Sequence, residues 1–290
     1  MRSQHKTAPD EMAHIGQGRT AEIFSWENGR VLRLFREGAS REWAWREMEV
    51  YRSVRRAGIA CPAVYPTESE DGLIEIDGRF GFVMDRIDGP SMLDLMTGKP
   101  WRLWRYARWF ATLHRRIHST VAEGLPSQHE RFHRTLDRIS ETVGSEIADR
   151  ARETIEEMEN GDAVCHSDFH PDNVLMSARG PVVIDWGPAT SGCVSADVAW
   201  TVYLLRDAAA PPGTGPLQRL LLALFRRLFL SAYRRAYLRG SLVSWSDVKR
   251  WEPAIAAIRL GDGIPEEREP LLRVIRKSFG STAARESLSG

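Results

Sequence analysis

Short runs of alternating apolar and polar residues dominate the chain up to about residue 86. The runs AEIFSW and VLRLF flank an Asn-Gly pair at 28–29, a dipeptide typical of two-residue hairpin turns. A second pair of runs, LIEI and RFGFVM, flanks an Asp-Gly pair at 77–78. Between the two pairs lies a helical run with Ser40 as its cap and Gly58 at its end. The pattern therefore predicts a small sheet with one helix.

Beyond that point the apolar residues recur at helical spacing, as in WRLWRYARWFATLHRRIH. Two helices with polar faces are expected at 131–142 and 145–159, followed by a polar loop, a short hairpin around SARG and further helices. The stretch PPGTGP at 211–216 is interpreted as a linker between two of these helices. We predict a bilobal α+β protein, with a small β-rich lobe (1–86) and a larger, mainly helical lobe (87–290).

One stretch is unusually polar for its apolar surroundings: CHSDFHPDNVLM, which is followed by VVIDWG. Asp168 and Asn173 lie five residues apart, and Asp185 follows twelve residues later at the end of a strand-like run. Phosphoryl transfer needs mainly positioning and charge neutralisation, and Mg²⁺ takes one or two hard oxygen ligands beside the phosphates. A further aspartate can orient an acceptor hydroxyl and receive its proton late in the reaction. The spacing of the three residues meets all of these needs.

The segments HSDFHPDNVL and VIDWG resemble the catalytic and metal-binding segments of the aminoglycoside phosphotransferase and choline kinase family, the small-molecule branch of the protein-kinase-like fold. The resemblance implies Asp168 as the catalytic base, and Asn173 and Asp185 as ligands of a magnesium ion. It also implies ATP or GTP as the phosphate donor and a hydroxyl of a small molecule as the acceptor. His166 would brace the catalytic loop.

The N-terminal lobe supports the same resemblance. IGQGRTAEIF, with Gly16 and Gly18 between two strands, resembles the nucleotide-covering loop of the family, since glycine lets backbone N–H groups approach phosphates. GFVMDRIDGPSM resembles the hinge between the lobes, where backbone groups from Asp85 to Ile87 would bind a purine base. The lobe at 1–86 is therefore interpreted as the nucleotide-binding lobe.

At one position the chain departs from the family pattern. The family carries a strand lysine that reaches the nucleotide phosphates, but VLRLF has Arg33 there, and the four lysines of the chain lie elsewhere. Arginine keeps the charge and can contact two oxygens, although it is bulkier. Glu47 is the best match for the helix carboxylate that pairs with this residue, and Glu42 is the alternative. We expect Arg33 to contact the nucleotide phosphates while Glu47 holds it.

Simpler interpretations compete with this one. An Asp-Asn pair in a loop is often a turn device. His166 and His170 have HxxxH spacing, but Pro171 argues against the helix that a zinc site of this spacing needs. A catalytically silent nucleotide-binding pseudokinase or scaffold is supported by Arg33 alone. A protein kinase is disfavoured because SADVAW follows Asp185 too soon for a long activation segment.

Two further residues resemble structural positions of the family. His114, in ATLHRRIH, is expected to pack, and Asp197, in SADVAW, is expected to steady the catalytic loop. A carboxylate at a helix N-terminus is the simpler explanation for Asp197. Neither residue is assigned any chemistry.

Composition narrows the partners and the location. A net charge of +1 gives no general basic character, so nucleic-acid binding is not expected. The three cysteines show no CxxC spacing, the N-terminus does not resemble a signal peptide, and the apolar run LLLALF is far too short to span a membrane. We therefore expect a cytoplasmic protein without membrane association.

The charge of the C-terminal part bears on the acceptor. Residues 201–290 hold 15 arginines and lysines against 8 aspartates and glutamates, which is a poor field for a polycationic aminoglycoside. Most of these arginines are expected on solvated helix faces. The balance still favours a neutral or anionic hydroxyl compound over an antibiotic as the acceptor.

Overall fold

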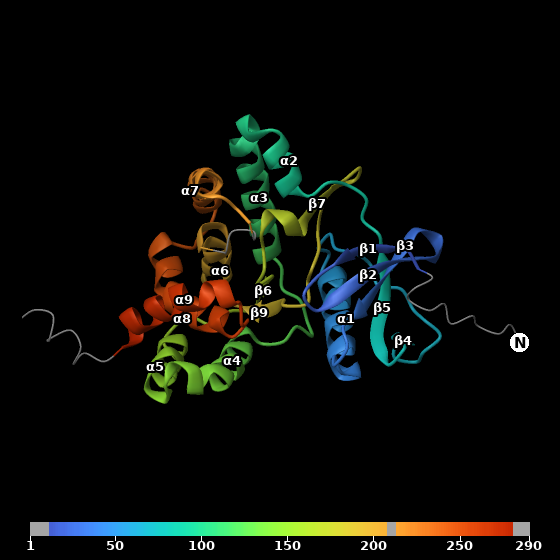
Figure 1. Cartoon of the computed structure of the whole chain (residues 1–290), viewed down its shortest axis with the longest axis horizontal. Coiled ribbons are helices and arrows are strands. Elements are labelled where there is room, and N and C mark those ends of the chain that lie inside the picture. The colour runs from blue at the N-terminus through green and yellow to red at the C-terminus, as the bar shows by residue number, and fades with distance from the viewer. Residues whose placement is uncertain (1–11, 208–212, 281–290) are drawn as a thin grey trace, which may run out of the picture. The chain divides into compact units, whose positions relative to one another are not determined.

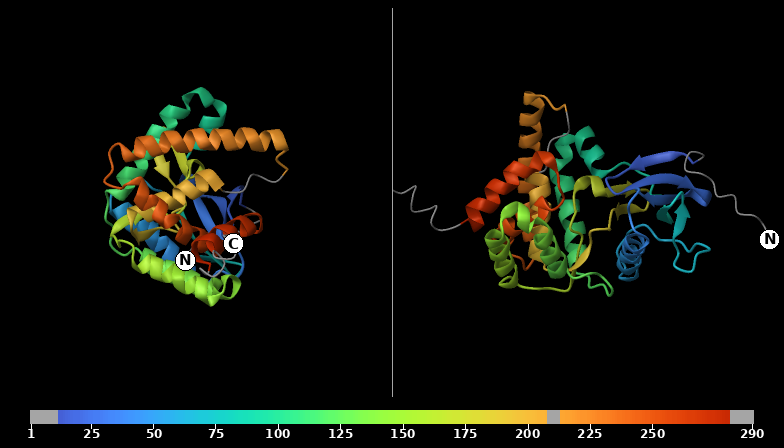
Figure 2. Two further views of the ribbon diagram at one scale, coloured as in Figure 1. Left: turned by 90° about the vertical axis from the view of Figure 1, so that its left-hand side faces the viewer. Right: turned by 60° about the horizontal axis from the view of Figure 1, so that its bottom comes forward.

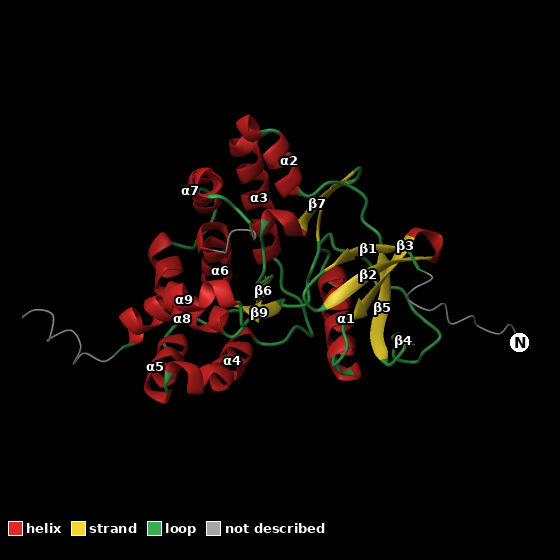
Figure 3. Cartoon of the chain, in the orientation of Figure 1, coloured by secondary structure: helices red, strands yellow, loops and turns green. Residues whose placement is uncertain are grey.

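The computed structural model describes residues 12–207 and 213–280, which form two compact units. The first unit contains the described residues up to Leu95 together with 122–124 and 172–188, and the second contains the rest. The large sheet belongs to the first unit, and most helices belong to the second (Figure 3). The predicted α+β class, with a small β-rich region followed by a mainly helical remainder, is confirmed. The lobe boundary at residue 86 stays a prediction.

The described part of the first unit is built on an antiparallel sheet of five strands in the order β1-β2-β3-β5-β4. Its strands are β1 (His14–Gln17), β2 (Ala21–Trp26), β3 (Arg30–Phe35), β4 (Ile74–Ile76) and β5 (Arg79–Asp85). Between β2 and β3, the short turn η2 (Glu27–Gly29) has positive φ angles at Asn28 and Gly29, +58° and +70°. The predicted hairpin is confirmed, but Trp26 pairs with Arg30, so three residues connect the strands instead of the expected two.

One face of this sheet is covered by a helix. Arg33 lies opposite Phe82 in the register of β3 and β5, so both side chains project from the same face. Helix α1 (Arg41–Arg56) packs on that face, where its Tyr51 meets the ring of Phe82 at 5.6 Å (Figure 1). Ser40 caps the helix through its side chain, as its sequence position predicts.

A later segment of the chain returns to the first unit. It contains the last two residues of the turn η4 (Pro171–Asn173) and the hairpin strands β7 (Val174–Ser177) and β8 (Gly180–Val183). The Met176 N–H donates to the carbonyl of Pro90 at 2.9 Å, and the Val183 N–H donates to the carbonyl of Ala60 at 3.2 Å. These bonds fasten the predicted metal-binding segment to the unit that carries Arg33.

The second unit is mainly helical. Its elements are η3 (Pro100–Arg102), α3 (Leu103–His118), α4 (Gln128–Val143), α5 (Ser145–Glu156), β6 (Ala163–Cys165), β9 (Thr190–Gly192), α6 (Val194–Asp207), α7 (Pro216–Leu238), α8 (Trp245–Leu260) and α9 (Pro265–Phe279), and α2 (Met92–Gly98) leads into it. The long helix α7, orange in Figure 2, packs on α3. Between them the Phe110 ring stacks on Phe169 at 4.3 Å and meets Phe229 at 5.7 Å. Burial of these rings forms part of the core.

The two helices expected at 131–142 and 145–159 are present as α4 and α5, with ends that differ by a few residues. The predicted linker at 211–216 lies partly outside the described residues, and Pro216 begins α7. Among the helices of the described residues, none is long and apolar enough to cross a membrane.

Candidate active site

Arg33 of β3 lies between two carboxylates. Its Nε donates to Oε1 of Glu47 on α1 at 2.7 Å, and its Nη2 donates to Oδ1 of Asp185 at 3.2 Å. Arg33 and Glu47 are buried, whereas the Asp185 side chain is 41% exposed. The cluster thus presents one accessible carboxylate beside a buried, fixed cation.

Electrostatics keeps Arg33 charged in this cluster. Burial alone would lower the pKa of Arg33, but the carboxylates of Glu47 and Asp185 outweigh it and raise that pKa. Burial raises the pKa of Glu47, while the Arg33 guanidinium acts in the opposite direction. A buried charge is tolerated when it is paired and hydrogen-bonded. Loss of Arg33 would therefore leave Glu47 as an uncompensated buried charge, and loss of Glu47 would leave buried Arg33 with the longer contact to Asp185.

The turn after β8 holds Asp185 in place. Asp185 has a left-handed backbone, with φ of +60°, which is uncommon for a residue other than glycine and concentrates at functional sites. The next residue, Trp186, is anchored twice. Its backbone N–H donates to the Tyr51 hydroxyl at 3.4 Å, and its indole N–H donates to the carbonyl of Val183 at 2.9 Å. This anchoring holds the Asp185 carboxylate next to Arg33.

Gly187, the last residue of VIDWG, allows Glu47 to reach the cluster. A Cβ at this position would lie between 2.6 and 2.9 Å from the carboxylate atoms of Glu47, closer than real side chains approach. A larger residue at this position would therefore require the Glu47 carboxylate to move. No role for Gly187 was expected from the sequence, although a glycine two residues after a predicted metal ligand is a signal of close backbone approach.

Asn173 lies at the start of the hairpin and is mostly buried. Its backbone carbonyl accepts the N–H of Ile184 at 3.0 Å, so it lies across from the residue that precedes Asp185. An amide oxygen and a carboxylate oxygen are ligands that Mg²⁺ prefers. Oδ2 of Asp185 makes no hydrogen bond with the described residues. The chemistry of this donor pair fits a magnesium ion.

The predicted nucleotide-covering loop is tied down on one side. Gly16 lies within β1 with open space where a Cβ would project, and Gly18 follows the strand. The Gly18 N–H donates to the carbonyl of Ala21 at 2.8 Å, and the Gly18 carbonyl accepts the Arg36 guanidinium at 3.0 Å. The N–H and the carbonyl of Gly18 are therefore both hydrogen-bonded to the protein itself. A phosphate would have to bind other amides of this loop.

The predicted hinge residue Asp85 ends β5 and is also engaged. Its N–H donates to the carbonyl of Ala63 at 2.9 Å, and its carboxylate accepts the Ala63 N–H and the Tyr65 hydroxyl. Ile87 follows, half-buried, in a segment without regular structure. The amide of Asp85 is thus taken by the protein, and base binding by residues 85–87 stays a prediction.

Asp168 lies in the second unit, after β6, with 27% of its side chain exposed. Burial raises the pKa of its carboxyl, but His170, whose Nε2 lies 3.7 Å from Oδ2, outweighs this effect and the pKa is lowered. The Asp168 N–H donates to Nδ1 of His166 at 3.2 Å. Asp168 is therefore a carboxylate at neutral pH, able to accept a hydrogen bond from a hydroxyl group.

Asp197, on α6, holds the backbone before Asp168. Its Oδ1 accepts the N–H of Ser167 at 2.6 Å, and its Oδ2 accepts the N–H of His166 at 3.0 Å. Burial raises the pKa of Asp197, but the two histidines described below outweigh it and hold the pKa well below its usual range. Ser167 has a left-handed φ of +60°, which these bonds help to hold.

Two histidines of α3 also contact Asp197. Nε2 of His114 and Nε2 of His118 each lie 3.0 Å from Oδ2 of Asp197. The ring of His114 is fully buried, and burial lowers its pKa to about 3. In the described part of the chain, these three side chains are spaced so that they could hold a metal ion. From the sequence His114 is expected to pack and His118 has no expected role, although an i, i+4 pair of histidines lies on one helix face.

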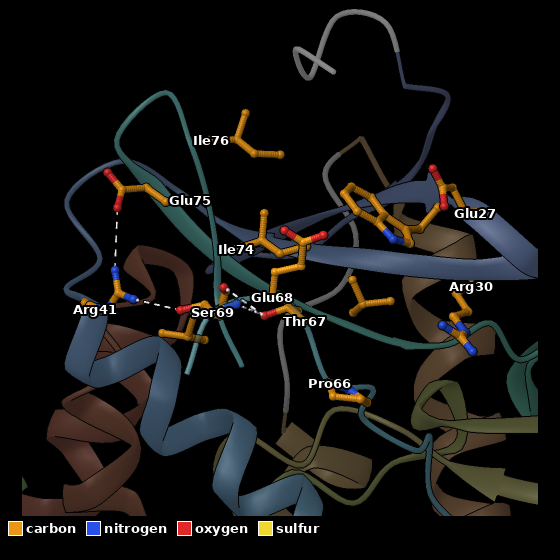
Figure 4. Close-up of a pocket in the computed structure, with 13 residues that line it drawn as sticks. Glu27, Arg30, Arg41, Pro66, Thr67, Glu68, Ser69, Ile74, Glu75 and Ile76 are labelled. Carbon is orange, nitrogen blue, oxygen red and sulfur yellow. Dashed lines mark hydrogen bonds and ion pairs between the residues drawn. The ribbon is translucent and has the colours of Figure 1, made fainter. Parts of the chain in front are cut away.

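A separate hollow of about 810 Å³ lies in the first unit (Figure 4). Val83, which lines it, pairs with Leu32 and so projects from the sheet face opposite that of Arg33. Arg41 spans part of its rim and contacts Glu75 and Ser69. The hollow contains none of the predicted site residues, and we assign it no part in the chemistry.

Known proteins place this architecture in a family. The model of the phosphotransferase enzyme family matches residues 15–242. No curated protein sequence matches the chain. The fold is similar to that of amicoumacin kinase hAmiN, solved with AMP-PNP, Ca²⁺ and Ami, with a TM-score of 0.62 and 12% identity over 94% of this chain and 88% of that one.

Two aminoglycoside phosphotransferases are also similar to this chain in fold, at low sequence identity. A thermostable mutant of APH(4)-Ia in its apo form has a TM-score of 0.62 and 16% identity, over 93% of this chain and 95% of the other. The streptomycin–ATP complex of APH(2")-IIa has a TM-score of 0.57 and 15% identity, over 94% and 92% of the two chains. The kinase-like fold predicted from the motifs is thus confirmed. The chain belongs to the phosphotransferase enzyme family.

Proposed function

We propose that this protein transfers the γ-phosphate of ATP or GTP to a hydroxyl group of a small molecule, in the presence of Mg²⁺. The observation that carries the proposal is the cluster of Arg33, Glu47 and Asp185, in which a strand cation is held between a helix carboxylate and an exposed aspartate. The phosphates of the donor need a cation beside them, and their metal ion needs a carboxylate close by.

The first unit supplies the donor-binding residues in this proposal. Arg33 contacts the phosphates, the loop with Gly16 and Gly18 covers them, and the backbone from Asp85 to Ile87 binds the base. Asn173 and Asp185 hold the magnesium ion, and their oxygen donors suit it. When bound, the ion neutralises charge on the phosphates.

Asp168 orients the acceptor. Its lowered pKa makes it a weak base in the ground state, so it accepts a hydrogen bond from the hydroxyl and takes the proton late, as the oxygen becomes acidic. His170 stabilises the carboxylate form of Asp168 until then. Orientation and late proton transfer are sufficient roles, because phosphoryl transfer needs little covalent assistance.

The acceptor is a neutral or anionic hydroxyl compound. The positive excess of residues 201–290 supports this class. A hollow of about 420 Å³ in the second unit adds to that support, since Arg227 and Arg234 line it without an ion pair among the described residues. Arg234 lies over the ring of Trp245 at 4.2 Å, which gives the hollow an aromatic wall. Such a surface repels a polycation.

The test is a screen of hydroxyl compounds for Mg²⁺-dependent consumption of ATP and GTP. Asp168→Asn keeps the shape and removes the charge, so it should lower turnover of the acceptor found by about a hundredfold or more. Calorimetry should find nucleotide affinity nearly unchanged in this variant. Asp172→Asn, an exposed aspartate of the same loop, is the matched control and should retain full turnover.

A silent nucleotide-binding pseudokinase is the second candidate, and the 3.2 Å contact of Arg33 with the predicted metal ligand Asp185 favours it. Wild-type turnover in Asp168→Asn would rule Asp168 out as the base. If the wild type binds Mg²⁺–nucleotide without turning it over but Arg33→Lys turns it over, the pseudokinase is the correct assignment.

A further inference from the structure

The Asp197 carboxylate is held by two equivalent side-chain arms. In the first, the Tyr233 hydroxyl lies 2.8 Å from Nδ1 of His114, whose Nε2 lies 3.0 Å from Oδ2 of Asp197. In the second, the Tyr237 hydroxyl lies 2.6 Å from Nδ1 of His118, whose Nε2 lies 3.0 Å from the same oxygen. Both tyrosines come from α7 and both histidines from α3.

Hydrogen-bond balance assigns the protons. An ionised carboxylate only accepts, so each histidine must carry its proton on Nε2 and donate it to Asp197. In neutral imidazoles each Nδ1 is then an acceptor, and each tyrosine hydroxyl donates to it. Tyr233 and Tyr237 therefore select the tautomer in which His114 and His118 can hold the carboxylate.

The same carboxylate holds the backbone that leads to Asp168. It accepts the N–H groups of His166 and Ser167, and the left-handed φ of Ser167 has to be maintained by such contacts. Without His118, Oδ2 of Asp197 would keep one histidine donor, the Nε2–H group of His114. The second histidine donor restrains the carboxylate from rotating away from the two loop amides.

We propose that His118 and Tyr237 are positioning residues for the catalytic loop, which act through Asp197 and couple helix α7 to the loop that carries Asp168. This inference rests on the proposed function of Asp168. A metal ion is the competing use of His114, His118 and Asp197. It is disfavoured because the hydrogen-bond balance already pairs all four ring nitrogens of the two histidines with tyrosine hydroxyls or Asp197.

The test compares His118→Phe, His118→Gln and Tyr237→Phe. His118→Phe removes the donor and should lower turnover roughly tenfold to a hundredfold, with an unchanged nucleotide KM, because the loop shifts while the donor site stays intact. His118→Gln keeps an N–H donor at similar reach and should restore most of the rate. Tyr237→Phe should lose less than His118→Phe, and the double variant should lose no more than His118→Phe, since Tyr237 acts through His118.

A second readout does not depend on activity. In His118→Phe, the amides of His166 and Ser167 should exchange with solvent at least about tenfold faster, as measured by NMR. Tyr203→Phe is the matched control, because the Tyr203 hydroxyl donates to a different buried carboxylate, Glu267, at 2.9 Å in the same unit. It should leave both amides unchanged.

Unchanged exchange at His166 and Ser167 in His118→Phe would overturn the proposal, whether or not the wild type is active. Equal loss of rate in His118→Gln and His118→Phe would also overturn it. Stoichiometric zinc in the purified wild type, absent from His118→Phe, would replace it with the metal site. Absence of any wild-type nucleotide turnover would count against the proposed function, and the exchange experiment alone would then decide the role of His118.

Discussion

Arg33 is bound by two carboxylates at once, which determines how it can serve a nucleotide. Its Nε and one terminal nitrogen are committed to Glu47 and Asp185. A guanidinium has further N–H donors on its outer edge, so it can keep these partners and still contact a phosphate oxygen. The contacts with both carboxylates hold the larger arginine side chain in place.

Arg33→Ala should raise the nucleotide KM and lower kcat, each by roughly tenfold or more, because a charge-assisted contact to the phosphates is lost. Glu47→Ala should act in the same direction, since buried Arg33 then loses its 2.7 Å partner and keeps the longer contact with Asp185. Steady-state kinetics of the two single variants and the double variant measures the coupling. The double variant should lose less than the sum of the singles, because the pair acts as one unit.

Arg33→Lys is the conservative control for this pair. Lysine supplies the cation that the family carries at this strand position, so activity should be retained. Wild-type kinetics in Arg33→Ala would show that Arg33 does not contact the nucleotide at all.

At the scale of elements, the site depends on how closely α1 approaches the turn after β8. Glu47 passes the backbone of Gly187 on its way to Arg33, at a separation that leaves no room for a methyl group. Trp186 pins the same turn to Tyr51 of α1. The helix and the turn therefore position the ion pair together.

Gly187→Ala should mimic Glu47→Ala, with a higher nucleotide KM, because the new Cβ displaces the Glu47 carboxylate from Arg33. Gly98→Ala is the matched control, since a Cβ there would meet nothing within 4 Å. Isothermal titration with Mg²⁺–AMP-PNP measures both. Equal affinities for the two variants would mean that Glu47 adjusts without leaving Arg33.

At the scale of the whole molecule, burial of titratable groups makes stability depend on pH. His114 has a pKa of about 3 in the folded protein because it is fully buried, whereas an exposed histidine titrates near pH 6.5. In acid, His114 therefore binds a proton in the unfolded chain but not in the folded protein. The stability is complete above about pH 6.5 and falls as the pH drops from there toward 3.

Urea unfolding at pH 7, 6 and 5 should show a decreasing free energy of unfolding, with a slope from His114 of up to about 1.4 kcal/mol per pH unit. Burial lowers the pKa of His129 as well, which adds to the same trend. His114→Gln removes one of the two groups and should flatten the slope while lowering stability at pH 7. Identical slopes in the variant and the wild type would contradict the assignment to His114.

The local signals in the sequence were sufficient for two hairpins and the first helix of the first unit, and for the motif residues. The Asn-Gly and Asp-Gly pairs predicted the β2-β3 and β4-β5 hairpins of the sheet, because their backbones adopt positive φ at little cost. Ser40 predicted the start of α1 for an equally local reason. Asp168, Asn173 and Asp185 were identified by spacing and resemblance, and their chemical roles stay predictions.

Long-range partners were decided by the tertiary structure alone. Glu42 and Glu47 lie on the same helix, but Glu42 pairs with Arg46 at the surface while Glu47 reaches Arg33. Asp185 joins that pair from 152 residues away. No local pattern contains such a contact, because it depends on which faces of distant elements pack together. The sequence suggested that Asp197 steadies the catalytic loop. Only the tertiary structure shows that two tyrosine–histidine arms hold Asp197, because each arm joins residues of two distant helices.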